Sequence, residues 1–173
     1  FFYDEHIGDY VIAADEIYPD SDFYPRDEAK EKRVELHIHT KMSAVDSTVD
    51  ISSVSELIKN WGHDAAAVTD SNCLYAYPEF EKASEIYGFK PIYGCEINIT
   101  EKNKVYSTTI IVRNRKGLKN LYKIITDAHL NAVSRVPITT FEKLSSFREG
   151  LLISAGSLKS IVAELYTCHE YEQ

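Results

Sequence analysis

Short apolar segments alternate with amphipathic ones along most of this chain, and that alternation limits the possible folds more than any other feature. The apolar segments have the length and residue content of β-strands, and they lie at residues 34–38, 64–70, 90–99, 105–112 and 150–154. The amphipathic segments repeat apolar residues at helical spacing, at residues 51–63, 77–87, 116–130 and 157–166. Strands that alternate with helices in this way predict an α/β fold with a mainly parallel sheet or barrel.

Two residue pairs predict where helices begin. Ser53 and Glu56 have the spacing of a capping box for the first helix, and Gly62 follows the end of that helix. Thr139 and Glu142 have the same spacing, which predicts a further short helix ahead of the last strand.

The first 33 residues differ from the rest of the chain in composition and lack its alternation of strands and helices. A short apolar run at 11–13 is typical of a strand, and a polar segment rich in charge and proline follows it. We therefore expect the end of a preceding domain at residues 1–20, a linker at 21–33 and a truncated α/β domain at 34–173. The chain begins with Phe rather than Met, which indicates a piece of a longer protein.

Composition excludes several classes of protein. No apolar run approaches the length of a membrane span, so we expect no membrane association. The cysteine content favours a cytoplasmic location, and the family resemblance described below implies a bacterial one. Three cysteines without CxxC spacing favour reduced thiols over a disulfide framework. The net charge of −8 argues against nucleic-acid binding over the whole surface, because lysine and arginine supply most of that affinity.

One basic cluster is a local exception to the acidic composition. Arg113, Arg115, Lys116, Lys119 and Lys123 follow one another with no acidic residue between them. The cluster is either a solvated helix face or, at Arg113, Arg115, Lys116 and Lys119, a nucleic-acid-binding surface.

The motif His37-Ile-His39 places two imidazoles on the same face of a strand, because side chains alternate along strands. Asp46 follows in the next loop, and Asp70 and Glu96 lie at the expected ends of the next two strands. Since the carboxyl ends of parallel strands meet at one edge, these side chains predict a divalent-metal site.

Each of these residues also has a structural interpretation. The histidine pair is compatible with a surface that binds nothing, and Asp70 with a cap on the next helix. Asp46 suits a turn, and Glu96 suits a solvated strand position. The joint arrangement favours a shared polar site over these separate roles.

The motifs VELHIHTKMSAVD, GHDAAAVTDSN, PIYGCEINI, NRKGLKNLYKIITDAHL and RVPITTFEKLSSFREGLLIS occur in this order. Together they resemble the PHP (polymerase and histidinol phosphatase) domain, and more narrowly its form in PolC-type alpha subunits of bacterial DNA polymerase III. The resemblance covers about residues 31–158 and implies part of a distorted (β/α)7 barrel. It also implies a rim that holds up to three metal ions, usually zinc, manganese or iron, and a preceding oligonucleotide-binding (OB) fold.

The resemblance assigns metal ligands to His37, His39, Asp46, Asp70 and Glu96. Other family ligands are replaced: Ser71 and Ser107 stand where the family has histidines, and Gly156 stands where it has a cysteine. The chain also ends before later family ligands. A hydroxyl is a poor substitute for imidazole on a zinc-like ion, so we expect zinc, manganese or magnesium at reduced occupancy.

The resemblance implies DNA replication as the process, with DNA and other replisome subunits as partners of the parent polymerase. The proofreading exonuclease that PolC-type chains carry between the strands at 90–99 and 105–112 is absent. Within that frame we expect a degenerate, mainly structural barrel, with no catalytic residue assigned. The alternatives are an active metal-dependent phosphoesterase or 3'-5' exonuclease and a free-standing enzyme of the histidinol-phosphatase kind.

Overall fold

The computed structural model describes residues 2–4, 9–11, 27–43, 46–102, 104–132, 136–155 and 159–167. Within these residues the chain forms a six-stranded sheet flanked by helices and a separate two-stranded sheet. The large sheet has the strand order β3-β4-β5-β6-β8, and β7 pairs with β5 beside this path. The predicted α/β class is confirmed.

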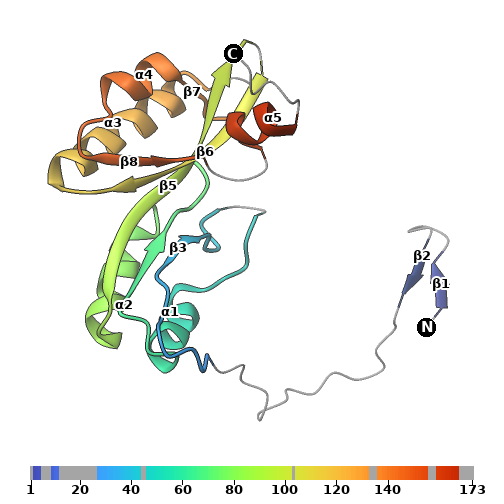
Figure 1. Ribbon diagram of the computed structural model, residues 1–173, viewed down its shortest axis with the longest axis vertical. Coiled ribbons are helices and arrows are strands. Elements are labelled where there is room, and N and C mark those ends of the chain that lie inside the picture. The colour runs from blue at the N-terminus through green and yellow to red at the C-terminus, as the bar shows by residue number, and fades with distance from the viewer. Residues whose placement is uncertain are drawn as a thin grey trace.

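The large sheet is mixed, with a parallel half and an antiparallel half (Figure 1). β3, β4 and β5 are parallel to one another, whereas β6 runs antiparallel to both β5 and β8. The tight turn between β5 and β6 produces this reversal, because a hairpin forces the second strand back along the first. The strands are β3 (Glu35–Ile38), β4 (Ala65–Val68), β5 (Lys90–Glu101), β6 (Lys104–Val112), β7 (Thr139–Thr140) and β8 (Leu151–Ser154).

The helices divide between the two halves of the sheet (Figure 1). α1 and α2 pack on each other beside the parallel strands, and α3 packs against β6, β7 and β8. The helices are α1 (Ile51–Asn60), α2 (Tyr77–Tyr87), α3 (Arg115–Leu130), α4 (Phe141–Ser146) and α5 (Ile161–Thr167).

Two apolar clusters form the core, one under each group of helices. Burying an aliphatic or aromatic side chain of this size stabilises a fold by roughly 1.5–3 kcal/mol. Along β5, Tyr93 packs against the first cluster while Cys95 and Ile97 belong to the second, so this strand joins the two halves. The first cluster includes Ile51, Ile58, Val68, Phe80 and Phe89, and the second includes Ile99, Ile110, Leu121, Ile124 and Leu144.

The predicted helix caps are each displaced along the chain. The capping box at Ser53 is wrong, because α1 begins earlier and Asp50 is its N-cap, accepting a hydrogen bond from the Ser52 amide. The N-cap of α4 is Thr140, whose hydroxyl accepts from the Lys143 amide, rather than Thr139. In both cases a neighbouring Asp or Thr offers an equivalent side-chain oxygen, and the register of the preceding segment decides which one caps.

Glu96 does not end its strand, contrary to the sequence prediction. β5 continues to Glu101 because its second half pairs with β6 as far as Glu101↔Lys104. A parallel bridge between Ser71 and Glu96 nevertheless places Glu96 level with the loop that leaves β4. The carboxylate therefore lies at the rim although its strand extends beyond it.

Near the N-terminus, β1 (Phe2–Asp4) and β2 (Asp9–Val11) form an antiparallel pair. The strand expected at 11–13 thus ends at Val11, and residues 12–26 lie outside the described part of the chain. The domain boundaries expected at 1–20, 21–33 and 34–173 stay predictions.

Candidate metal centre

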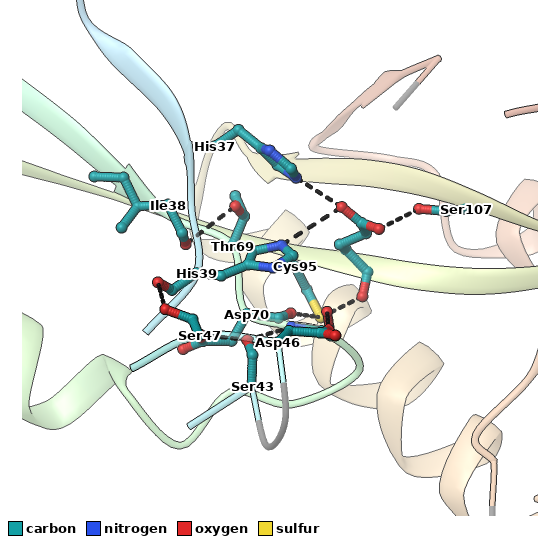
Figure 2. Close-up of polar contacts among 12 residues, drawn as sticks. His37, Ile38, His39, Ser43, Asp46, Ser47, Thr69, Asp70, Cys95 and Ser107 are labelled. Atoms are coloured by element: carbon teal, nitrogen blue, oxygen red, sulfur yellow. Dashed lines mark hydrogen bonds and ion pairs between the residues drawn. The ribbon is translucent and has the colours of Figure 1, made fainter. Parts of the chain in front are cut away.

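The two histidines of the His-x-His motif lie side by side at the end of β3. His37 is on the strand, and His39 follows it where the chain turns into the loop. Their ring centroids are 4.7 Å apart with an interplanar angle of 61°. The same-face geometry predicted from the sequence brings both rings toward one point (Figure 2).

Glu96 lies within reach of both imidazoles. Its Oε2 atom is 2.6 Å from Nε2 of His37 and 3.5 Å from Nε2 of His39. One candidate ligand atom from each of the three residues lies within 4.8 Å of the others. Nε2 of His39 is buried and, among the described residues, forms no hydrogen bond. A buried nitrogen that pairs with Glu96 but forms no hydrogen bond is still able to bind a ligand, which suits a metal ligand.

His39 and Glu96 each favour the charged form of the other. The neighbouring His39 holds the pKa of Glu96 down to about 2, although burial acts in the opposite direction, and Ser107 and His37 lower it further. Glu96 in turn raises the pKa of His39 against the effect of burial. The lowered pKa favours the ionised carboxylate of Glu96, and the raised pKa of His39 means that a cation at its Nε2 atom competes with a proton.

Cation binding is expected to tighten as the pH rises through the raised pKa of His39, since a metal ligand must be neutral imidazole. The folding stability of the metal-free chain is expected to change with pH in the opposite direction. The His39–Glu96 pair stabilises the fold while His39 is protonated, and this stabilisation is lost as the pH rises through the pKa of His39. Calorimetric titration with Mn²⁺ from about pH 5 to about pH 8 measures the first effect. An affinity that does not change over this range would contradict the assignment.

Asp70 is buried and used inside the fold rather than at the histidine pair. It is 1% exposed, and its Oδ1 accepts hydrogen bonds from the Thr40 amide at 2.6 Å and the Ser43 hydroxyl at 2.6 Å. The Thr40 hydroxyl also donates to Oδ2 at 2.9 Å. These contacts tie the loop after β3 to the end of β4.

Ser71 and Ser107, which the resemblance places where the family has histidines, each donate to a carboxylate of the predicted site. The Ser71 hydroxyl donates to Oδ2 of Asp46 at 2.7 Å, and the Ser107 hydroxyl donates to Oε1 of Glu96 (Figure 2). Each of the two carboxylates thus has one oxygen that already accepts a hydrogen bond from a neutral hydroxyl group. Of the predicted ligands, His37, His39 and Glu96 come together, while Asp46 and Asp70 each bond elsewhere.

Sequence reasoning missed Thr40 and Ser43, the two residues that hold Asp70. The sequence indicates their role only weakly, through two hydroxyl residues in the loop that directly follows the His-x-His motif. A buried carboxylate needs donors, and such a loop is the nearest source of them.

The predicted basic cluster lies at and before the start of α3. Arg113 and Arg115 line a pocket of about 430 Å³ with Tyr93 and Leu118, and Lys116 pairs with Glu149 at 2.5 Å. Lys119 lies one turn further along the exposed side of the helix. The nucleic-acid role of this cluster stays a prediction.

The sequence profile of the PHP domain matches residues 35–173. The chain belongs to the PHP domain family. This confirms the resemblance drawn from the motifs. In the described residues, no helix is long and apolar enough to cross a membrane.

The relatives of this PHP domain include replicative polymerase subunits. It is 33% identical over 177 residues to a PolC-type DNA polymerase III of Staphylococcus epidermidis, covering 95% of this chain and 12% of that protein. It is 33% identical over 118 residues to a DNA polymerase III subunit alpha of Staphylococcus aureus, covering 68% of this chain and 11% of that protein. The chain therefore spans about an eighth of the PolC-type relative.

Among solved structures, a protein from Bifidobacterium adolescentis described as a metal-dependent phosphoesterase aligns with a TM-score of 0.43 and 15% identity. That alignment covers 56% of this chain and 32% of the other.

Proposed function

We propose that this PHP domain is part of a PolC-type alpha subunit of bacterial DNA polymerase III and acts in DNA replication. The identity to PolC-type and alpha-subunit relatives over the PHP region supports this assignment. In this proposal the parent chain is a cytoplasmic DNA-directed DNA polymerase that binds DNA and other replisome subunits. In this proposal the paired strands β1 and β2 belong to the end of a preceding OB fold at residues 1–20, and residues 21–33 are the linker.

We further propose that His37, His39 and Glu96 hold a single divalent cation. Two imidazoles and one carboxylate on one side of an ion leave its other positions open, and imidazole donors favour zinc over magnesium. When bound, such an ion polarises a phosphoryl oxygen and lowers the pKa of a bound water. The chain's own contribution is to orient the carboxylate, which Ser107 does by donating to its second oxygen.

The domain is in this proposal mainly structural rather than a working phosphoesterase. Multi-ion hydrolysis needs bridging carboxylates that are free to bind two cations. Asp70 is already bound by Thr40 and Ser43, and Asp46 accepts from Ser71. The buried Nε2 of His39 beside Glu96 is the observation that carries the single-cation assignment.

Elemental analysis of the purified chain tests this proposal. We expect about one bound zinc or manganese per chain or less, and little hydrolysis of a phosphodiester even with added metal. His37→Ala combined with His39→Ala should remove the bound metal. His63→Ala is the matched control, because that imidazole contacts Asp27 instead of the site, at 3.0 Å.

Two or more ions per chain together with turnover of about 1 per second or faster would contradict a structural role. The active phosphoesterase or exonuclease would then be the correct alternative.

A further inference from the structure

The solvent-facing side of α3 carries cations and aromatic rings without a carboxylate. Its residues recur every three or four positions, so they form one stripe along the helix, and all of them are exposed. The only acid of α3, Asp127, lies beside this stripe and pairs with Lys143 at 2.8 Å. In a chain of net charge −8, this stripe is a local cationic surface. The stripe comprises Arg115, Lys119, Tyr122, Thr126 and His129.

Hollows lie on both sides of Tyr122, which is 45% exposed. One, of about 490 Å³, is lined by Tyr122, His129 and Tyr75, and Tyr75 is 71% exposed. The other, of about 300 Å³, is lined by Tyr122, Lys123 and Phe147 and by the ion pair of Lys143 with Asp127, which neutralises the one carboxylate there. Nζ of Lys123 is 5.3 Å from the Phe147 ring centroid. Exposed rings beside hollows and cations are the elements of a base-stacking surface.

The stripe ends at the rim that carries the candidate metal centre. His129, in the last turn of α3, contacts the backbone carbonyl of Asn72 through Nε2 at 2.7 Å. The Asn72 amide donates to the backbone carbonyl of Glu96 at 2.7 Å. Two hydrogen bonds thus connect the C-terminal end of α3 to the backbone of β5 at Glu96.

We propose that the exposed face of α3 binds single-stranded nucleic acid, with phosphates at Arg115, Lys119 and Lys123 and bases stacked on Tyr122 and Tyr75. A helix of 16 residues is about 24 Å long, enough for about four nucleotides. Duplex fits less well, because its stacked bases cannot reach the rings. An acidic peptide matches the cations but leaves the tyrosines without partners. The inference goes beyond the proposed function and does not require a bound cation.

Fluorescence anisotropy of the 173-residue chain with a labelled oligothymidylate tests this inference. We expect binding that persists in EDTA and exceeds binding to duplex of equal length. Tyr122→Ala should weaken it about tenfold, since each stacked base contributes on this scale. Lys119→Gln should reduce the magnitude of the slope of log affinity against log salt by about 0.7.

The matched controls remove the same residue types elsewhere on the surface. Tyr166→Ala removes a tyrosine of α5 that is 68% exposed, and Lys82→Gln removes an exposed lysine of α2. Both should leave affinity and salt slope unchanged. A thermal melt of each variant separates lost binding from lost folding.

Three results would overturn the inference. The first is equal affinity in folded Tyr122→Ala and in the unmodified chain. The second is a salt slope that Lys119→Gln leaves unaltered. The third is competition by polyglutamate as strong as that by the unlabelled oligonucleotide, which would identify the face as a general anion surface.

Discussion

Ser71→His combined with Ser107→His is expected to raise the number of divalent cations bound by the chain. Each serine hydroxyl now donates to a carboxylate, Ser71 to Asp46 and Ser107 to Glu96. An imidazole at each position would replace a neutral donor with a nitrogen ligand beside an acid, and nitrogen and carboxylate donors together suit zinc. We therefore expect about one further cation per chain, measured by elemental analysis after dialysis.

The matched control for this experiment is Ser71→Asn combined with Ser107→Asn. The amides have a similar size but offer no imidazole nitrogen, so they should not raise the metal content. Ser107 is 5% exposed, and the larger side chain there is expected to disturb packing, which the asparagine variant measures independently. Equal metal content in the histidine and asparagine variants would show that the serines are not what limits the number of ions.

The elements of the fold could largely be predicted from the sequence, because periodicity records which side of each segment is buried. The strand at 105–112 and the helix at 116–130 correspond to β6 and α3 within a residue at each end. The caps could not be placed so well, since Asp50 and Ser53 are both good N-cap residues. The sheet was expected to be mainly parallel, but β6 runs antiparallel to β5 because a tight turn joins the two strands.

The candidate site was predictable only in part. The strand period alone places His37 and His39 together, and that arrangement is present. The contact of Ser107 with Glu96 depends on the register Asn98↔Ser107 between β5 and β6, which makes Glu96 a diagonal neighbour of Ser107.

The position of Asp70 was not predictable in the same way. Whether its oxygens face a metal or a loop depends on the path of residues 40–43, which no periodicity records. The sequence assigns it as a metal ligand, whereas its contacts in the fold are those of a residue that holds a loop. These two roles predict different results when the side chain is removed.

Asp70→Ala is expected to lower the free energy of unfolding of the metal-free chain by about 3 kcal/mol. The substitution leaves the Thr40 amide and the Thr40 and Ser43 hydroxyls as donors without their acceptor, in a site that is 1% exposed or less at Asp70, Thr40 and Ser43. Hydrogen bonds to a charged acceptor contribute more than neutral ones, and unsatisfied buried donors add a desolvation cost. Urea denaturation in EDTA measures the change.

Asp70→Asn and Asp46→Ala make this experiment specific. The asparagine amide keeps one acceptor oxygen for the loop but loses the charge. The free energy of unfolding of Asp70→Asn should therefore lie between those of Asp70→Ala and the unmodified chain. Asp46 is exposed and accepts from the Ser71 hydroxyl, so its removal should cost about 0.5 kcal/mol or less. If instead Asp70→Ala left unfolding unchanged and removed the bound cation, Asp70 would act as a metal ligand. The loop contacts would then be incidental to stability, and the site would contain a fourth ligand.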